Sequence, residues 1–271
     1  EPQWDSPWGA GRPGWHIECS AMSSELLGQP FDIHAGGMDL KFPHHENEIA
    51  QSEAACGCDY ARYWMHAGLL NINGEKMSKS LGNFFTIREV LEKYDAEVIR
   101  YFMLSGLYRS PLNYSEDNMQ QAFSSLERLY TCLRGLPEAS VIKDSPFEQR
   151  FLDVMDDDFN SPEALAVLFD LAREVNRLKD QGQQTQAASS AALLKQLAGI
   201  FGILQHDPDA FLQGDADQQD LQKIEGLIAE RNQARDQKDW RRADEIRDEL
   251  LSMNIAIEDG SGGTVWRRIK A

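Results

Sequence analysis

The chain has 271 residues, of which 42% are apolar, and a formal net charge of −17. This length suggests one to three domains, and the charge argues against bulk non-specific nucleic-acid binding without excluding a local RNA site. No run approaches the ~18 uncharged apolar residues of a membrane span, and the N-terminus lacks the basic and apolar regions of a signal peptide. Four cysteines in a chain this long make no disulfide framework, so we expect reduced thiols and a cytoplasmic protein without a membrane partner.

The first part of the chain predicts α/β structure. Strand and helix patterns alternate there, which is typical of a mostly parallel sheet. A glycine follows the first helix as a C-cap, and Asn73-Gly74 closes the last strand as a turn. The predicted elements are a helix from Trp15 to Leu27, a strand from Phe31 to His34, a helix from Pro43 to about Ala55, and a strand from Tyr63 to Ile72.

After about Phe84 the apolar period becomes helical, which predicts a bundle. Thr86 and Glu89 have the spacing of a capping box, and Ser115 could cap a long helix that ends near Leu133. Ser161 is a predicted N-cap, followed by Pro162 at the first helical position. A further helix is expected from Ala187 to Leu204.

The end of the chain predicts a separate small domain. Residues His206 to Asp220 are polar and contain Pro and Gly, so we expect a linker. Two charged helices should follow, at about Leu221 to Gln237 and Asp239 to Ser252. The Gly-rich stretch between the β-like runs of Ile255 to Arg268 predicts a hairpin.

Metal-capable side chains gather at the start of the helix that follows Pro43. His44 and Glu48 are four residues apart and share a face, whereas His45 is about 100° away. Cys19 on the preceding helix could add a thiolate. Three protein ligands with an open position are typical of catalytic zinc, but spacing alone leaves a chance polar helix start as the alternative, and does not choose between His44 and His45.

A loop rich in lysine and serine follows the Asn73-Gly74 turn. Lys76 and Lys79 are three residues apart, and Ser78 and Ser80 alternate with them. Two ammonium groups on such a loop can close on a polyphosphate and neutralise the charge of departing pyrophosphate.

Lys76-Met77-Ser78-Lys79-Ser80 matches the KMSKS signature of class I aminoacyl-tRNA synthetases, and the stretches "GWHIECSAM", "FDIHAGG" and "FPHHENEIAQSEA" resemble the cysteinyl-tRNA synthetase family in particular. "YDAEVIRYFMLSG" resembles the start of that family's helical bundle, and "DWRRADEIRDEL" its C-terminal module. The resemblance implies the second half of a Rossmann-type α/β catalytic domain, then an α-helical bundle and a small α+β domain. The segments expected are 1–72 (catalytic half), 73–114 (KMSKS loop and connector), 115–205 (anticodon-stem bundle), 206–220 (linker) and 221–271 (anticodon domain).

The resemblance also implies the activity and its residues. The family ligates L-cysteine to tRNA(Cys) through a cysteinyl adenylate, using ATP with Mg²⁺ and one Zn²⁺ that recognises the substrate thiol. Motif matching assigns the zinc to Cys19, His44 and Glu48, the amino-acid pocket to Trp15 and His34, and ATP to Asp39, Gly36, Gly37 and Lys79, with Lys76 and Lys79 catalytic. The anticodon candidates are Arg235, Trp240, Asp244, Asp259 and Trp266.

Some alternatives stay open. Trp15, His34 and Asp39 could be a core indole, a satisfied strand-end histidine and a turn cap. Trp266 could equally hold a small core together, while Arg267 and Arg268 are expected to meet phosphate. Cys56-Gly57-Cys58 is interpreted as a loop.

The family's zinc-binding cysteine and HIGH-type motif of the N-terminal half are not found in this sequence, so we expect the chain to be inactive alone. Nothing in the sequence suggests more than a monomer. The rival functions are a zinc-dependent cysteine ligase acting on an amino sugar, which should lack an anticodon domain, and a non-catalytic tRNA-binding fragment.

Overall fold

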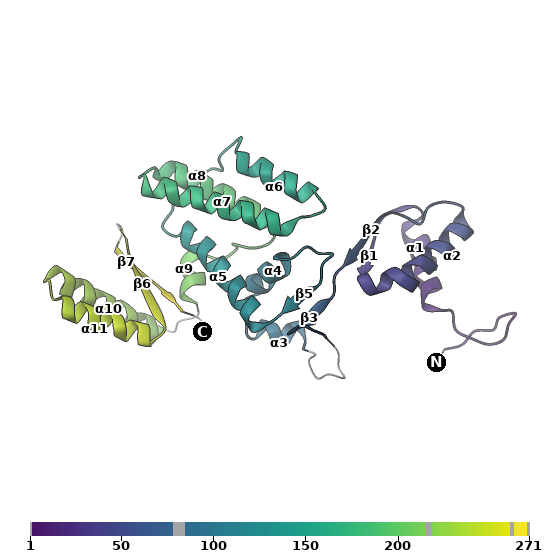
Figure 1. The fold of residues 1–271 in the computed structure, drawn as a ribbon, viewed down its shortest axis with the longest axis horizontal. Coiled ribbons are helices and arrows are strands. Elements are labelled where there is room, and N and C mark those ends of the chain that lie inside the picture. The colour runs from purple at the N-terminus through teal and green to yellow at the C-terminus, as the bar shows by residue number, and fades with distance from the viewer. Residues whose placement is uncertain (1, 78–84, 215–217, 261–262, 270–271) are drawn as a thin grey trace. The chain divides into compact units, whose positions relative to one another are not determined.

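The computed structural model describes residues 2–77, 85–214, 218–260 and 263–269, except the side chains of Lys76, Gln218 and Gln219. The chain forms two compact units (Figure 1). The N-terminal unit comprises residues 1–90 and 103–118, and the C-terminal unit comprises residues 91–102 and 119–271. Because the units interleave along the chain, each draws on two separate stretches of sequence.

The N-terminal unit is built around a strand–helix–strand repeat. Strand β1, Phe31–Gly37, pairs in parallel with β2, Ala61–Ala67, and helix α2, Glu46–Cys56, connects them. This confirms the parallel α/β arrangement predicted from the sequence. Helix α1, Trp15–Leu27, packs on α2 and ends at Gly28, whose φ of 77° is readily adopted by glycine. The predicted helix start at Pro43 is confirmed, because the helical segment Lys41–His45 leads directly into α2 and Phe42, just before Pro43, is its one non-helical residue.

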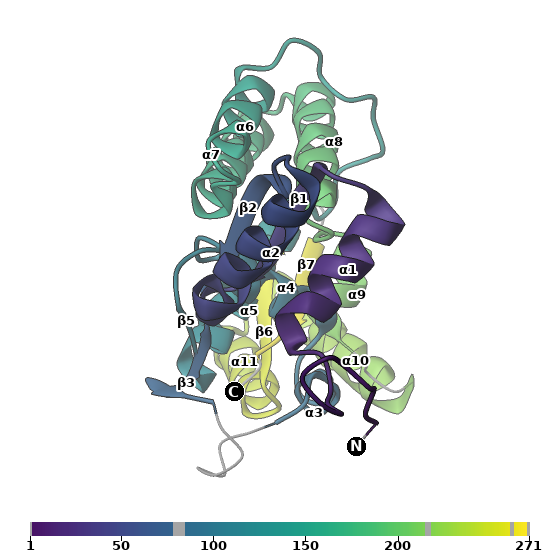
Figure 2. The ribbon, with the colours of Figure 1, turned by 90° about the vertical axis from the view of Figure 1, so that its right-hand side faces the viewer.

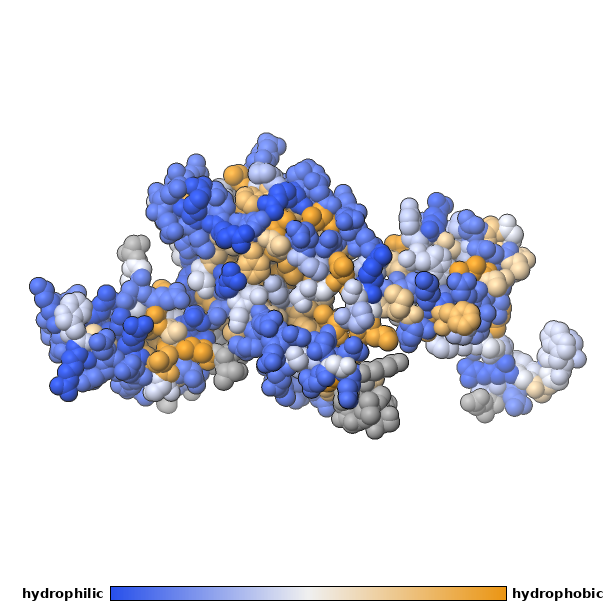
Figure 3. All heavy atoms as spheres, in the orientation of Figure 1, coloured by the Kyte–Doolittle hydropathy of each residue, from blue (hydrophilic) through white to orange (hydrophobic). Residues whose placement is uncertain are grey.

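Helix α1 meets α2 with a polar side rather than an apolar one. Ser20 is buried, and its hydroxyl donates to Gln51 Oε1 at 3.2 Å. Four apolar residues of α1 are exposed instead: Ile17, Met22, Leu26 and Leu27. Apolar side chains are accordingly visible at the surface around α1 and α2 (Figure 3).

The predicted strand from Tyr63 to Ile72 is divided in two. Strand β3, Leu70–Ile72, follows β2 after a break at Gly68, where a Cβ would collide with the backbone of Ser110. Strand β4, Glu75–Lys76, pairs antiparallel with β3, and β5, Leu112–Tyr114, pairs with β3 in parallel. Asn73 and Gly74 have φ values of 50° and 83°, as a tight hairpin turn requires.

The cysteines depart in part from the expectation of reduced thiols. Cys56 and Cys58 form a disulfide, whereas Cys19 and Cys132 are free. Cys56 is the last residue of α2, and Gly57 follows as its C-cap with φ 71°. The interpretation of this stretch as a loop therefore holds only from Gly57 onward.

The C-terminal unit contains a helical bundle. Helices α6, α7 and α8 lie side by side in both views (Figures 1 and 2). Buried residues of α7 recur three to four positions apart, including Leu168, Leu171 and Val175, which is the pattern of a helix facing a core. None of the described helices is long and apolar enough to cross a membrane. The bounds are α4 Ala96–Leu104, α5 Glu116–Leu133, α6 Pro146–Asp156, α7 Ser161–Asp180 and α8 Gln184–Ile200.

Several predicted caps are confirmed. The Thr86 hydroxyl accepts from the Glu89 amide at 3.3 Å and the Glu89 carboxylate accepts from the Thr86 amide at 2.6 Å, which completes the capping box before α3, Ile87–Leu91. Ser115 Oγ accepts from the Asn118 amide at 3.2 Å, so this serine caps α5 as expected.

Two boundary predictions were wrong. Asn160, not Ser161, caps α7, because the Asn160 side chain accepts from the Glu163 amide. The expected linker from His206 to Asp220 contains a short helix, α9, Pro208–Gln213. Asp207 caps that helix by accepting from two backbone amides at 3.0 Å each.

A small helical hairpin and a β-hairpin end the chain. Helices α10, Gln218–Asp236, and α11, Trp240–Ser252, pack together and against antiparallel strands β6, Ile255–Gly260, and β7, Gly263–Arg268. The predicted hairpin is thus confirmed. The buried residues of its core are Ile224, Ile228, Ile246, Leu250, Ile255 and Trp266.

A buried carboxylate joins distant parts of the bundle. Glu97 on α4 is 5% exposed. Its Oε2 accepts from the Tyr130 hydroxyl at 2.8 Å and the Leu204 amide at 2.9 Å, and its Oε1 accepts from the Gln205 amide at 2.7 Å. Burial raises the pKa of Tyr130, so this hydroxyl keeps its proton and acts as the donor. Glu97 therefore links α4, α5 and the turn after α8.

Replacing Glu97 with alanine should lower the free energy of unfolding by about 2–4 kcal/mol, because buried donors lose their acceptor. Urea unfolding followed by circular dichroism measures this change. Glu92→Ala, which removes an exposed carboxylate nearby, should change stability by less than about 0.5 kcal/mol. Equal effects of the two substitutions would show that the buried bonds contribute little.

Candidate metal centre and nucleic-acid interface

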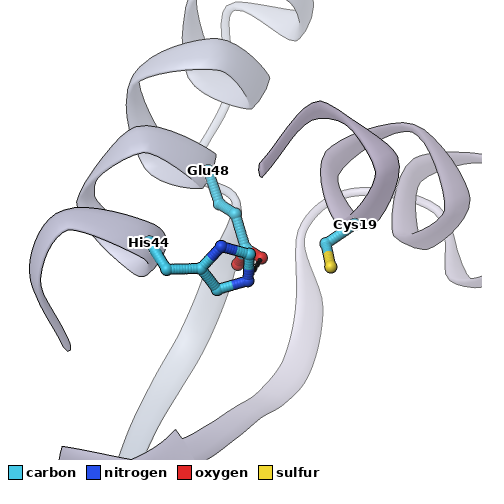
Figure 4. Close-up of side chains that lie close together, drawn as sticks. All are labelled: Cys19, His44 and Glu48. Carbon is cyan, nitrogen blue, oxygen red and sulfur yellow. Dashed lines mark ion pairs between the residues drawn. The ribbon is translucent and has the colours of Figure 1, made fainter. Parts of the chain in front are cut away.

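Cys19, His44 and Glu48 come together between α1 and α2. One potential ligand atom from each lies within 4.8 Å of the others. His44 Nε2 is 2.7 Å from Glu48 Oε1, and the Cys19 sulfur faces them from α1 (Figure 4). His44 is 5% exposed and Glu48 is fully buried. The i, i+4 spacing thus places imidazole and carboxylate together, as the sequence predicts.

Glu48 has imidazole neighbours on both of its oxygens. Its Oε2 lies 2.7 Å from His34 Nε2, just as its Oε1 lies 2.7 Å from His44 Nε2. Each contact is a hydrogen bond only where the imidazole nitrogen carries a proton. A bound cation is the other means of compensating a buried carboxylate. A sulfur, an imidazole nitrogen and a carboxylate oxygen are all normal zinc ligands, so these residues fit a zinc ion.

A second group of possible ligands shares Glu48. His34, His45 and Glu48 also have ligand atoms within 4.8 Å of one another. His45 Nδ1 is 2.8 Å from His66 Nε2, and burial lowers the pKa of His45. Only the group with His44 includes a sulfur, which softer metals prefer. The two groups meet the same distance criterion, so it is the chemistry of the sulfur ligand that favours His44 over His45 for zinc.

The Cys19 thiol is held protonated in the absence of a cation. Burial raises its pKa, and the Glu48 carboxylate raises it further. A divalent cation reverses this effect because metal ligation favours the thiolate. Cys19 therefore has the surroundings of a ligand whose deprotonation depends on the metal.

Trp15 and His34, the predicted pocket residues, both lie at this group. The Trp15 ring centroid is 4.3 Å from that of His44, and Trp15 is 57% exposed, so it is not a core indole. His34 contacts Glu48 directly, as described above. Sequence reasoning missed His16, whose Nδ1 is 2.6 Å from His44 Nδ1. Its position three residues before Cys19 on the same helix was an available signal.

Among the predicted ATP residues, Gly36 and Gly37 are the last two residues of β1, and Asp39 lies in the short helical segment Met38–Leu40 that follows. Gly36 lies against the His45 ring, and a Cβ there would come within 2.8 Å of the ring carbon Cε1. A Cβ on Gly37 would overlap the Asp39 carboxylate, and Asp39 itself is exposed. Gly36 thus has a packing reason, the buried His45 ring, whereas the exposed Asp39 side chain can move away from a Cβ on Gly37. Lys76 lies in β4, whereas Lys79 lies outside the described residues.

The anticodon candidates are divided between surface and core. Trp240 is 60% exposed at the start of α11, and Asp244 is exposed one turn later, which places the two on one face. Trp266 is 5% exposed in the core of the C-terminal hairpins. Its burial favours the structural role that the sequence left open beside base stacking.

Asp259 is held by a network of cations. Arg231 contacts both of its oxygens at 2.9 Å, Arg235 Nη1 lies 2.6 Å from Oδ2, and the Thr264 hydroxyl donates at 2.8 Å. The Arg231 guanidinium holds the pKa of Asp259 well below its usual range. Arg235 and Asp259, both anticodon candidates, are therefore partners of each other.

Arg267 and Arg268 are paired with carboxylates of the protein. Arg267 Nη1 is 2.6 Å from Glu127 Oε1, and Arg268 Nη2 is 2.9 Å from Asp220 Oδ2. These ion pairs argue against the phosphate role that the sequence suggested for the two arginines.

Comparison with known proteins gives matches along most of the chain. Residues 1–124 match the family described as tRNA synthetases class I (C) catalytic domain, residues 150–205 match the DALR domain, and residues 222–267 match the cysteinyl-tRNA ligase anticodon binding domain. The order of these matches follows the fold, with the α/β part first and the small hairpin module last.

Two curated relatives show how far the similarity extends. The cysteine–tRNA ligase of Coxiella burnetii (strain Dugway) is 60% identical over 268 residues, which cover 99% of this chain and 58% of the relative. That of Stutzerimonas stutzeri is 62% identical, with coverages of 98% and 58%. The chain thus spans somewhat more than half the length of these relatives and matches their C-terminal portion.

A solved structure agrees with the fold. The Agrobacterium radiobacter LeuRS, determined in a ternary complex with tRNA and LeuAMS, aligns with a TM-score of 0.52 and 17% identity, covering 77% of this chain and 33% of that one. On its three family matches and its identity to the relatives, this chain belongs to the cysteinyl-tRNA synthetase family.

Proposed function

We propose that this chain supplies the thiol-recognition centre and the tRNA-binding parts of an enzyme that joins L-cysteine to tRNA(Cys). The observation that carries this proposal is the convergence of Cys19, His44 and Glu48 beside the exposed ring of Trp15. Free cysteine differs from serine by one sulfur atom. A centre that binds sulfur discriminates more strongly between them than a pocket that measures only size.

Each side chain of the centre has a separate task. Cys19, His44 and Glu48 would hold the zinc ion, and His34 would keep the Glu48 carboxylate aligned through its second oxygen. When bound there, zinc supplies a soft acceptor for the substrate sulfur. The Trp15 ring would form one wall of the amino-acid pocket, since it lies against His44 yet remains accessible.

The ATP-binding residues would lie along the strand ends that follow this centre. Asp39 would accept from ribose hydroxyls, while Gly36 and Gly37 allow close approach of the nucleotide. Lys79, with Lys76, would contact the phosphates of ATP–Mg²⁺ as the cysteine carboxylate attacks the α-phosphorus. Pyrophosphate departs, and a terminal adenosine hydroxyl of the tRNA then attacks the carbonyl of the cysteinyl adenylate, so that the cysteinyl ester forms and AMP leaves.

The C-terminal unit would bind tRNA. Its bundle would contact the anticodon stem, and Arg235, Trp240, Asp244 and Asp259 would read the anticodon. Unstacked loop bases are recognised by stacking on aromatic rings and by hydrogen bonds to their edges. The exposed indole of Trp240 suits the first of these roles, and the exposed carboxylate of Asp244 suits the second.

Two other functions fit this chain less well. A cysteine ligase acting on an amino sugar has no need of an anticodon module, so the match of residues 222–267 to an anticodon-binding family argues against it. A non-catalytic tRNA-binding fragment has no need of a preserved metal centre, so the convergence of Cys19, His44 and Glu48 argues against that alternative.

Cysteine-dependent ATP–pyrophosphate exchange tests the proposed activity. Since the chain spans 58% of its relatives, we expect it to be silent alone and the full-length Coxiella burnetii relative to exchange. Exchange by this chain alone would show that the remaining portion of the relatives is not required.

Zinc titration tests the metal centre without requiring activity. The chain should bind zinc weakly and below one equivalent, because the family resemblance implies a further cysteine ligand that is not found in this sequence. Cys19→Ser should abolish binding by removing the sulfur. Competition with a chromophoric chelator measures the affinity. The matched control is Cys132→Ala, which removes a free thiol buried in the bundle and should leave binding unchanged. Zinc retained by Cys19→Ser would refute the proposed ligand set.

Fluorescence anisotropy with labelled tRNA(Cys) tests the anticodon role of Trp240. Trp240→Ala should weaken binding by about 1–3 kcal/mol, the usual loss for removing a base-stacking aromatic ring, and Trp240→Phe should restore most of it. Leu251→Ala, an exposed apolar truncation near the end of the same helix, is the control. Unchanged affinity in Trp240→Ala would remove this residue from the interface.

A further inference from the structure

We propose that Arg134 and Arg267 are positioning residues that hold the C-terminal module, α10, α11 and hairpin β6–β7, in a fixed place on the helical bundle. Through this hold, the stem-binding and anticodon-reading surfaces would engage one tRNA together. The inference rests on the proposed tRNA-binding function, and goes beyond it by assigning a role to two side chains that need not touch RNA.

Arg134 is the centre of the first contact. It follows α5 directly, and its side chain is only 9% exposed. Its Nη2 donates to the carbonyl oxygen of Trp266 at 2.8 Å, and its Nε lies 2.6 Å from Asp209 Oδ1 on α9. Lys179 Nζ on α7 donates to the Arg134 carbonyl at 3.0 Å. One buried guanidinium thus connects the bundle, the short helix α9 and strand β7.

The contact between Arg134 and Trp266 affects the whole module, because Trp266 is part of the module's core. Its indole lies in the module's core, against residues such as Ile246 and Ile255, while its carbonyl faces the bundle and accepts from Arg134. Trp266 therefore connects the two parts: its indole packs in the module core, and its carbonyl binds the Arg134 guanidinium of the bundle. A shift of the module would take the Trp266 carbonyl away from Arg134 and leave the guanidinium only the Asp209 carboxylate, which is costly for a side chain with so little exposed surface.

Arg267 supplies a second contact one residue further along β7. Its Nη1 lies 2.6 Å from Glu127 Oε1 on α5, and its Nε lies 3.4 Å from Glu258 Oε1 on β6. The hairpin is thus held at two points. Arg134 of the bundle binds the backbone carbonyl of Trp266, and the Arg267 side chain of the hairpin binds Glu127 on α5. Two separate contacts restrain rotation as well as translation.

The two arginine contacts also fix the position of the anticodon candidates, because these residues lie in the same C-terminal module. Asp259 pairs with Thr264 across the hairpin, two positions from Trp266, and its carboxylate contacts Arg235 on α10. At about 3.3 Å per strand residue, the gripped position is about 7 Å from this pair. When two surfaces bind one ligand, a fixed separation raises the effective concentration of the second contact, by factors that can reach about 10²–10⁴ in affinity.

The test compares two RNAs on this chain. One is the full-length tRNA(Cys) transcript, which spans both surfaces, and the other is a short single-stranded RNA with the anticodon-loop sequence, which reaches only the module. Arg134→Ala with Arg267→Ala should weaken binding of the transcript at least about tenfold. Binding of the short RNA should change less than twofold.

Two further variants separate positioning from general damage. Arg177→Ala is the matched control, because Arg177 pairs with Glu174 on its own helix and does not contact the module. It should alter neither affinity. If Arg134→Ala prevents folding, the partly exposed Arg267 pair decides the question: Arg267→Glu should weaken only the transcript, and the exchanged pair Glu127→Arg with Arg267→Glu should restore it.

Several outcomes would overturn the proposal. Equal losses for both RNAs would indicate that the arginines merely stabilise the module, and unchanged affinity for the transcript would indicate that the module needs no fixed place. If short-RNA binding is absent in the unmodified chain while the transcript binds, the anticodon-reading function itself fails, and this result is distinguishable from failure of the positioning role.

Discussion

A carboxylate with no exposed surface is the constraint on which the candidate centre depends. Glu48 lies in the first turn of α2 and is fully buried, and an ionised group there requires compensation from charge or from hydrogen bonds. Its two oxygens face His34 and His44, so the strand and the helix are both oriented by this one group. Cys19 on α1 then closes the remaining side, which explains why three separate elements must be in place before the centre exists.

The C-terminal unit uses the same physical device for a different purpose. Glu97 and Arg134 are buried ionisable residues, and each joins segments that are more than thirty residues apart along the chain. Apolar packing gives the bundle its stability, but it specifies burial more strictly than it specifies one unique arrangement. A displacement of one helix on another costs more at buried charges, because each displaced donor or acceptor loses its partner. We interpret them as the groups that set register, while the leucines supply the bulk of the burial.

Local sequence signals predicted individual turns, caps and hairpins well, but they did not predict the tertiary contacts that these elements make. The capping box at Thr86, the turn at Asn73-Gly74 and the last hairpin were confirmed because each is fixed by contacts within a few residues. The short helix α9 was missed because Pro and Gly in a polar stretch resemble a linker, and its stability comes from Phe211 and Leu212 packing on the bundle. The His44–Glu48 pair followed from helical spacing, and the position of His16 on the helix of Cys19 was also available from spacing. The approach of His34 on β1 depends on tertiary contacts that spacing cannot reveal.

The network around Asp259 restricts how an anticodon base could be read there. Its carboxylate stays ionised because Arg231 and Arg235 lie on it, so it can only accept hydrogen bonds, as the amino and imino groups of guanine require. Those arginines already occupy directions that a base would need. A base must therefore share the carboxylate with Arg231 and displace the more exposed Arg235, or bind Arg235 through an acceptor of its own. Because the Arg231 contact is bidentate and the more buried of the two, we expect Arg231 to hold Asp259 in place while Arg235 moves to the RNA.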